Sequence, residues 1–248
     1  MRVALFVTCL IDTMRPQAAF ASIQLLEQAG CEVEVPEQQT CCGQPAYNNG
    51  DMDNARQLAR HTIDSLQGYD YIVIPSGSCA GMMIHHYPRL FTDEPEWLAK
   101  AEALASCSYE LTQFLHDVVK FETSVTCPQT LTYHDSCSCK RELGVEQQPR
   151  QLLSRLDGLV LNEMEETEVC CGFGGTFAVT YPEISAQMVG NKTSNIKASG
   201  AQLLAAADLG CLLNIAGKLS REQSPVRAFH IAEVLAGLTD KAAIGEED

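Results

Sequence analysis

The feature of this sequence that most constrains its fold is a cysteine pattern that occurs twice. Cys9 precedes Cys41 by 32 positions and Cys42 precedes Cys79 by 37, while Cys137 precedes Cys170 by 33 and Cys171 precedes Cys211 by 40. In both halves the central pair is followed by glycine, as Cys41-Cys42-Gly43 and Cys170-Cys171-Gly172. Chance does not readily place four cysteines at one spacing twice, so we interpret the chain as two repeated halves.

The hydrophobic pattern of each half alternates between strands and helices. In the first half it predicts strands at 3–8, 32–35 and 71–74, with helices at 15–29 and 51–66. In the second half it predicts strands at 131–134 and 159–161, a helix at 148–156, a long helix at 182–198 and an apolar run at 203–209. This order predicts an α/β fold of two pseudo-symmetric halves, each a mostly parallel sheet with flanking helices.

We place the boundary between the halves near residue 125. Thr123, Ser124, Thr126 and Pro128 interrupt the chain there, after an expected helix around Phe114 and before the first strand of the second half. The predicted domains are therefore 1–125 and 126–248, each with one Cys-Cys-Gly repeat. The acidic end, residues 245–248, is expected to be disordered.

Composition and charge exclude several classes of partner and compartment. The net charge of −15 would repel nucleic-acid phosphates and anionic membranes, so no nucleic acid is expected to bind. The short apolar start lacks the features of a signal peptide, and no run approaches the roughly 18 apolar residues of a membrane helix. We therefore expect a cytoplasmic protein without direct membrane insertion, in which 12 cysteines serve metals or catalysis rather than disulfides.

The eight repeated cysteines are the predicted metal ligands. Each set follows the ends of strands, and in open α/β folds ligands bind at this edge of the sheet. The predicted cofactor-binding and metal-binding residues are Cys9, Cys41, Cys42 and Cys79 in the first half and Cys137, Cys170, Cys171 and Cys211 in the second.

Adjacent cysteines favour a multinuclear centre, because two consecutive side chains bind different irons more easily than one tetrahedral ion. We therefore expect an iron–sulfur cluster of the 4Fe-4S type, one or two per chain, with backbone N–H groups at Gly43 and Gly172 close to sulfur. Zinc also accepts four thiolates and remains the alternative, in one half or in both.

Residues outside this pattern receive other interpretations. Four cysteines do not fit the repeated spacing: Cys31, Cys107, Cys127 and Cys139. Cys31 and Cys107 are expected in the core, where cysteine acts as a small apolar residue. Cys139 could replace Cys137 as a ligand, but Cys137 fits the repeated spacing better. His134 is either a sulfur contact or a packed strand-end residue. Lys192 and Lys197 lie on one expected helix and could bind the carboxylate of a substrate, but two lysines on a helix seldom have this role.

Three strings in the sequence are specific enough to indicate a family. They are Cys41-Cys42-Gly43-Gln44-Pro45-Ala46-Tyr47-Asn48, His134-Asp135-Ser136-Cys137 and Cys170-Cys171-Gly172-Phe173-Gly174-Gly175-Thr176-Phe177. The chain resembles, over nearly its whole length, the cysteine-rich Cys-Cys-Gly repeat family, which is found in heterodisulfide reductase and in the iron–sulfur component of glycolate oxidase. Within it, the strings are most similar to the lactate-utilisation proteins of the LutA/YkgE type.

The resemblance implies an iron–sulfur subunit of an NAD-independent L-lactate oxidoreductase complex, which converts lactate to pyruvate. It further implies a ferredoxin-like iron–sulfur partner and a third subunit, with a small 2-hydroxy acid as a candidate ligand. The open alternatives are disulfide reduction, as in heterodisulfide reductase, and a zinc-stabilised scaffold subunit.

The sequence departs from the family in one respect. The fullest motif of the wider family ends in Cys-x-x-Cys, but Ser76 and Asp208 stand at the first of these positions here. Each half therefore has four repeated cysteines instead of five, which still suffice for a four-iron cluster. Oxygen ligation by Ser76 or Asp208 is the less favoured alternative.

Overall fold

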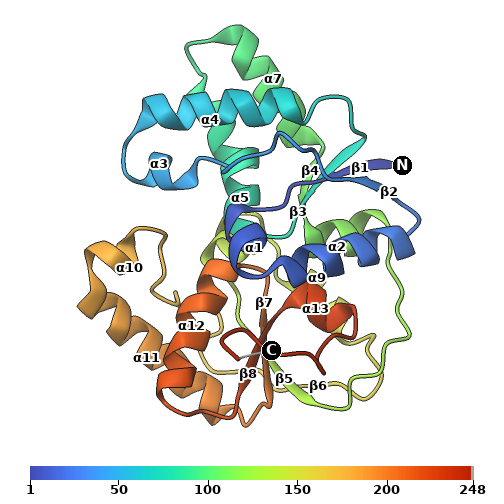
Figure 1. Cartoon of the computed structure of the whole chain (residues 1–248), viewed down its shortest axis with the longest axis vertical. Helices are drawn as coiled ribbons and strands as arrows, with labels where there is room; N and C mark the ends of the chain where they lie inside the picture. The colour runs from blue at the N-terminus through green and yellow to red at the C-terminus, as the bar shows by residue number, and fades with distance from the viewer. Residues whose placement is uncertain (247–248) are drawn as a thin grey trace.

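The chain folds into two four-stranded sheets, each with all of its strands parallel. A computed structural model describes residues 1–246 and places the first sheet above the second in the view of Figure 1. The strand order is β2-β1-β3-β4 in one sheet and β6-β5-β7-β8 in the other, so the two halves share one topology. The predicted fold class is confirmed.

The strands are short and follow the expected order. In the first half they are β1 (Arg2–Leu5), β2 (Glu32–Glu34), β3 (Tyr71–Ile74) and β4 (Ser108–Glu110), and in the second β5 (Thr130–Tyr133), β6 (Val160–Leu161), β7 (Leu203–Ala206) and β8 (Arg227–His230). Figure 1 shows the central strands of each sheet between helices. The strands β4 and β8 were not predicted, because their sequences, Ser-Tyr-Glu and Arg-Ala-Phe-His, contain no apolar run like those of β3 and β7.

Helices connect consecutive strands, as parallel pairing requires. The first half contains α1 (Cys9–Met14), α2 (Pro16–Gln28), α3 (Gln44–Asn48), α4 (Met52–Ser65), α5 (Gly77–Gly81), the π-helical turn η1 (Met82–His86), α6 (Tyr87–Leu90), α7 (Pro95–Ser106), α8 (Leu111–Gln113) and the π-helical turn η2 (Phe114–Val118). The second contains the π-helical turn η3 (Ser138–Glu142), α9 (Gln147–Leu153), α10 (Phe177–Thr180), α11 (Pro182–Ala198), α12 (Leu209–Arg221) and α13 (Ile231–Leu235).

The predicted helix boundaries have local causes. Pro16 occupies the first turn of α2, where its missing N–H costs no hydrogen bond, and Gly30 follows the helix with φ of +81°. The Asp51 side chain accepts a hydrogen bond from the Asn54 N–H at 3.3 Å and so caps α4. These signals were present in the sequence.

One hydrophobic core joins the halves, and each half adds a core of its own. The shared cluster includes Leu25 of α2, Leu131 of β5 and Phe229 of β8, all fully buried. A second cluster around Phe6 and Ile74 lies within the first half, and a third around Leu204 and Leu212 lies mainly in the second. This packing fixes the carboxyl ends of both sheets relative to each other.

The expected disordered tail is wrong for residues 245 and 246. Glu246 forms an ion pair with Arg227 at 3.0 Å and accepts a hydrogen bond from the Ala243 N–H at 2.8 Å, which ties this segment to β8. Residues 247 and 248 lie outside the described part of the chain. Among the described helices, none has the combined length and apolarity to traverse a lipid bilayer.

Candidate metal centres

The four predicted ligands of the first half come together at the carboxyl end of its sheet. Cys9 begins α1 after β1, Cys41 and Cys42 lie in the loop after β2, and Cys79 lies in α5 after β3. The Sγ atoms of Cys9 and Cys41 are 4.0 Å apart, and those of Cys42 and Cys79 are 3.4 Å apart. Cys42 and Cys79 are buried, whereas Cys9 is exposed.

The four predicted ligands of the second half occupy the corresponding elements. Cys137 follows β5, Cys170 and Cys171 lie in the loop after β6, and Cys211 lies in α12 after β7. Cys171 is buried and Cys137 is exposed, as in the first half. A ring nitrogen of His134 and the Sγ atoms of Cys171 and Cys211 all lie within 4.8 Å of one another.

A glycine holds each Cys-Cys loop in place. Gly43 and Gly172 have φ angles of +84° and +83°, which L side chains rarely adopt. A Cβ atom at Gly172 would lie 2.9 Å from the Ser185 carbonyl oxygen, so a side chain does not fit there. The Gly43 and Gly172 N–H groups point at the Sγ atoms of Cys41 and Cys170, at 3.5 and 3.4 Å.

A side chain from a neighbouring helix fixes the second cysteine of each pair. In the first half the Tyr87 hydroxyl donates to the Cys42 carbonyl oxygen at 2.8 Å, and in the second the Asn214 amide donates to the Cys171 carbonyl oxygen at 2.9 Å. Both bonds hold the cysteine backbone in the orientation that brings its thiol into the group. The two residues differ in type, so the repeat spacing alone does not reveal them.

Hydrogen bonds between the thiols of each group favour the thiolate form of Cys41 in the first half and of Cys170 and Cys211 in the second. Hydrogen bonds from the Cys42 and Cys9 thiols lower the pKa of Cys41, and those from the Cys137 and Cys171 thiols lower the pKa of Cys170. The pKa of Cys211 falls to about 7, mainly through a hydrogen bond from Cys171. A metal centre would favour deprotonation of the remaining thiols, because thiolates are the ligand form.

The chemistry of both groups fits a thiolate-ligated metal centre. All eight cysteines are free, and the sulfur pairs Cys9–Cys41 and Cys42–Cys79 are separated by more than the roughly 2.05 Å of a disulfide bond. Four thiols that converge from separate loops, with backbone N–H groups aimed at sulfur, match the environment of a structural zinc ion or an iron–sulfur cluster.

Comparison with known proteins identifies the family. The cysteine-rich CCG domain family matches residues 3–84 and 131–216, one segment in each half. The chain belongs to this family. A protein from Bacillus cytotoxicus named Lactate utilization protein A is 48% identical over 236 residues, covering 95% of this chain and 98% of its own. A protein of the same name from an Exiguobacterium species is also 48% identical, covering 94% and 96%.

A solved structure supports the fold assignment. A hypothetical protein from Helicobacter pylori superimposes with a TM-score of 0.66 over the whole of this chain at 11% identity. The chain spans about half the length of that protein, 49%. At this identity the similarity concerns the fold alone, whereas the relatives at 48% identity confirm the resemblance of this CCG protein to lactate-utilisation proteins.

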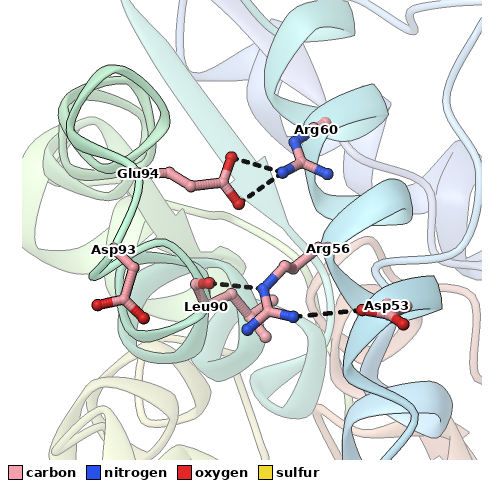
Figure 2. Close-up of a pocket in the computed structure, with 6 residues that line it drawn as sticks. All are labelled: Asp53, Arg56, Arg60, Leu90, Asp93 and Glu94. Carbon is pink, nitrogen blue, oxygen red and sulfur yellow. Dashed lines mark hydrogen bonds and ion pairs between the residues drawn. The ribbon is translucent and has the colours of Figure 1, made fainter.

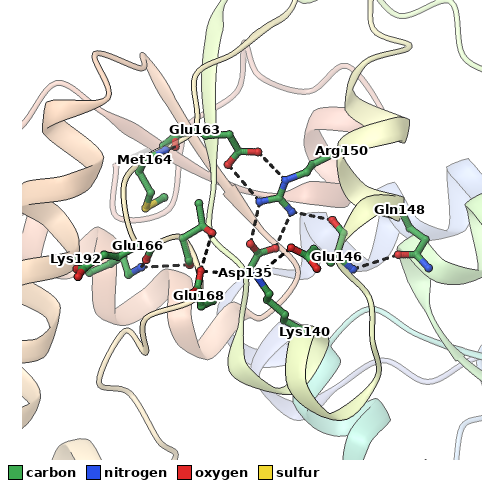
Figure 3. A network of polar contacts seen from close by, with 12 residues as sticks. Asp135, Lys140, Glu146, Gln148, Arg150, Glu163, Met164, Glu166, Glu168 and Lys192 are labelled. Atoms are coloured by element: carbon green, nitrogen blue, oxygen red, sulfur yellow. Dashed lines mark hydrogen bonds and ion pairs between the residues drawn. The ribbon is translucent and has the colours of Figure 1, made fainter.

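In the second half, a polar network surrounds the ligand loops (Figure 3). The Arg150 guanidinium binds both carboxylate oxygens of the buried Asp135, at 2.9 and 2.8 Å, and also pairs with Glu163 at 2.6 Å. Asp135 lies in the loop that carries Cys137, and Glu163 begins the segment that leads to Cys170. Arg150 therefore ties together the two segments on which three predicted ligands lie.

A buried lysine anchors the same segment from the other side. The Lys192 ammonium donates to the carbonyl oxygens of Glu166 and Thr167 at 2.5 and 3.2 Å, and burial lowers its pKa. Lys192 is only 1% exposed, so it offers no solvent-accessible site for a carboxylate. Lys197 instead pairs with Glu222 at 2.7 Å on the surface.

Ser76 and Asp208, the two residues considered above as oxygen ligands, bind each other across the interface between the halves. The Ser76 hydroxyl donates to Asp208 Oδ1 at 2.7 Å, and the Ser78 N–H and hydroxyl donate to the same oxygen at 3.0 and 2.7 Å. Ser136 donates to the other oxygen, Oδ2. These bonds occupy Asp208 with protein donors and give it a role that joins the halves.

The remaining four cysteines do not belong to either group of predicted ligands. Cys31 and Cys127 are buried in the shared core, and Cys107 is half-buried at the end of α7. Cys139 is buried with its Sγ atom 4.0 Å from Asp208 Oδ2, on the interface side of the second group. Cys137, not Cys139, shares a hydrogen bond with Cys170.

Two surface cavities differ in their relation to the cysteines. The cavity in Figure 2, of about 290 Å³, lies between α4 and the segment from α6 to α7, and no cysteine lines it. Its two arginines are already paired: Arg60 binds Glu94 at 2.6 Å, and Arg56 binds the Leu90 carbonyl oxygen at 3.0 Å. A second cavity, of about 430 Å³, is lined by Cys9 and Cys41 together with Asp12 and Glu37.

Proposed function

We propose that this chain is the iron–sulfur redox subunit of a multi-subunit, NAD-independent L-lactate oxidoreductase that converts lactate to pyruvate. The observation that carries the proposal is the convergence of four free cysteines at the carboxyl end of each sheet, in a chain 48% identical to proteins named for lactate utilization. The proposed ligands are Cys9, Cys41, Cys42 and Cys79 for one centre and Cys137, Cys170, Cys171 and Cys211 for the other.

Each cysteine group has an inner and an outer side. Cys42 and Cys171 are buried against the hydrophobic core, whereas Cys9 and Cys137 are exposed. The inner side keeps water away from part of the centre, and the outer side brings it close to the surface, where a redox partner can approach. Oxidation of lactate to pyruvate releases two electrons and two protons, and an iron–sulfur cluster in each half would store one electron.

The charges around the first group argue that the lactate carboxylate binds elsewhere in the complex. Asp12 and Glu37 line the cavity beside Cys9 and Cys41, and none of its lining residues is a lysine or arginine. Two carboxylates repel an anionic 2-hydroxy acid. We therefore assign lactate binding to a partner subunit and electron transfer to this chain.

The same surface suits a protein partner. Phe20, Val35 and the first part of α2 surround this cavity, and Phe20 is 63% exposed. An apolar rim with acidic residues near a redox centre is the type of surface on which redox partners dock. A ferredoxin-like iron–sulfur subunit and a third subunit are the proposed partners.

Metal analysis of the anaerobically purified chain tests this proposal. We expect iron and acid-labile sulfide equal to one or two four-iron clusters per chain, and an electron paramagnetic resonance (EPR) signal after reduction. With the partner subunits present, lactate should reduce the clusters, and without them it should not. Zinc without sulfide would contradict the redox role and favour the scaffold, and metal-free reactive thiols would favour disulfide reduction.

A further inference from the structure

His134 is a buried histidine whose ring nitrogens form no hydrogen bond with a nitrogen or oxygen atom of the described residues, and its ring faces the sulfur of Cys211. Its side chain is 1% exposed, and both ring nitrogens, Nδ1 and Nε2, are buried without a nitrogen or oxygen partner. A buried polar group without a partner costs about 1–3 kcal/mol. Because His134 carries two such atoms, a further group is expected to bind at least one of them.

The imidazole of His134 lies beside the second cysteine group. One of its nitrogens is within 4.8 Å of the Sγ atoms of both Cys171 and Cys211, which come from different loops. Three donor atoms at this separation can bind one metal ion between them. Imidazole nitrogen and thiolate sulfur bind together in zinc sites, and imidazoles replace two thiolates in one class of two-iron clusters.

The fold itself does not require a histidine at this position. Phe6 occupies the corresponding place in the first half, three residues before Cys9, just as His134 is three residues before Cys137. Phe6 is fully buried and packs with Cys42 and Cys79 in the apolar cluster of that half. The same position thus accepts an apolar ring, so the polar ring of the second half calls for a separate reason.

We propose that His134 is a ligand of the metal centre in the second half, which then has a mixed nitrogen and thiolate donor set. The first centre, with Phe6 in this place, has thiolate donors only. The inference rests on the proposed metal centres and deepens them. Asp208 does not compete for this role, because its carboxylate accepts hydrogen bonds from Ser76, Ser78 and Ser136.

A neutral imidazole changes the charge of the centre. It adds no negative charge, whereas every thiolate adds one, and less negative charge raises the reduction potential of an iron–sulfur centre. The second centre should therefore have the higher potential of the two. Electrons that enter at the first centre would then pass to the second.

Nitrogen hyperfine coupling tests the ligand assignment directly. The chain is produced with ¹⁵N-labelled histidine in a Cys42→Ala background, which removes the first centre, and the reduced protein is measured by pulsed EPR. We expect a ¹⁵N coupling of the size typical of a directly bound imidazole. It should be lost in His134→Phe and retained in the control His61→Phe, since His61 is exposed on α4.

A second variant guards against misfolding. His134→Cys offers a thiolate in place of the imidazole, so we expect it to keep the iron and sulfide content, lose the coupling and lower the reduction potential. Iron and sulfide without a His134-dependent coupling would overturn the inference alone. A Cys42→Ala protein without any metal would overturn both the proposed redox centre and the inference. Zinc without iron or sulfide would overturn the redox role alone, and the inference then requires a zinc–nitrogen distance of about 2.0–2.1 Å that is lost in His134→Phe.

Discussion

The two halves place their cysteines in the same way but surround them differently. Phe6, Val7 and Thr8 precede the first cysteine of the first half, whereas His134, Asp135 and Ser136 precede that of the second. The first loop packs largely on apolar neighbours, and the second joins a network of ion pairs and hydrogen bonds. Both loops place a cysteine at the carboxyl end of the sheet in their own half. This placement therefore does not depend on the polar residues His134, Asp135 and Ser136.

This difference suggests that the repeat fixes the position of the thiols, while the added polar residues set the properties of one centre. Arg150, Asp135 and Lys192 bring charge and rigidity to the second half. The loop glycines Gly43 and Gly172 face Leu58 of α4 and Met188 of α11, so the position of Lys192 corresponds to that of Thr62, which is buried but uncharged. The halves should therefore respond differently to equivalent substitutions.

The largest expected effect is the loss of one centre at a time. Cys42→Ala should remove the metal of the first half and Cys171→Ala that of the second, because each takes away a buried ligand. Metal and sulfide analysis with EPR should show about half of the wild-type content in each variant, with the other centre unaffected. The control Cys107→Ala should keep all metal and cost about 1 kcal/mol of stability. Equal losses in all three variants would contradict the ligand assignment.

Removal of Arg150 should have the next largest effect, confined to the second half. Arg150→Met leaves the carboxylate of Asp135, which is 1% exposed, without its ion pair, and breaking a buried pair costs about 3 kcal/mol. Anaerobic urea unfolding and metal analysis should show this loss together with lower occupancy of the second centre. The first centre should be unchanged.

The matched control for Arg150 lies in the first half. Arg60 pairs with Glu94 on the surface, where both side chains are about a third exposed, at 34% and 38%. Arg60→Met should cost less than about 1 kcal/mol and leave both centres intact. Similar costs for the two variants would mean that the network of the second half adds no stability.

The Asp208 cluster, which joins the halves, should have an intermediate effect on both. Asp208→Asn removes a charge that accepts hydrogen bonds from Ser76, Ser78 and Ser136, and we expect a loss of about 2 kcal/mol in urea unfolding. The exposed Asp93 supplies the control, since Asp93→Asn should stay within about 0.5 kcal/mol. If both variants unfold like the wild type, the buried contact between the halves contributes nothing to stability.

The sequence predicted the repeated architecture because its signals are local and occur twice. The Asp51 cap, Pro16 and Gly30 marked helix ends, and the spacing of the cysteines placed them after strands. The strands β4 and β8 were not predicted, since both end in a polar residue, Glu110 or His230, whose burial is not visible in the sequence. The division at residue 125 and the metal ligation itself remain predictions.

The partners of the cysteine loops could not be predicted, because they come from distant parts of the chain. Tyr87 and Asn214 fix the two Cys-Cys carbonyl oxygens from different helices, and Arg150 reaches Asp135 only in the folded state. Ser76 and Asp208 are 132 positions apart, yet they share a hydrogen bond. The string His134-Asp135-Ser136-Cys137 was a visible signal, but its meaning depends on the burial of His134.

The smallest expected effect concerns the two buried residues that end the last strand of each half and cap the helix after it. Glu110 caps α8 and His230 caps α13; burial raises the pKa of Glu110 to about 7 and lowers the pKa of His230. Between pH 6 and pH 8 an unfolded chain holds almost no proton on Glu110, whereas the folded chain releases one near pH 7. The folded state binds more protons there, so its stability falls as pH rises.

Relative to a Glu110→Gln variant, the wild type should lose about 1 kcal/mol of stability between pH 6 and pH 8, measured by anaerobic urea unfolding of both proteins. Glu110→Gln keeps an oxygen that accepts from the Thr112 and Gln113 N–H groups and cannot ionise, so the variant lacks this loss. His230 acts with the opposite sign: its pKa is lowered in the folded chain, whereas the unfolded chain still binds a proton there below about pH 6.5, so His230 makes stability rise with pH at the acidic end of this range. The wild type and Glu110→Gln share this rise, so the difference between the two proteins isolates Glu110. The same pH dependence in the wild type and in Glu110→Gln would show that the cap of the first half does not titrate in this range, and this difference between the halves would not hold.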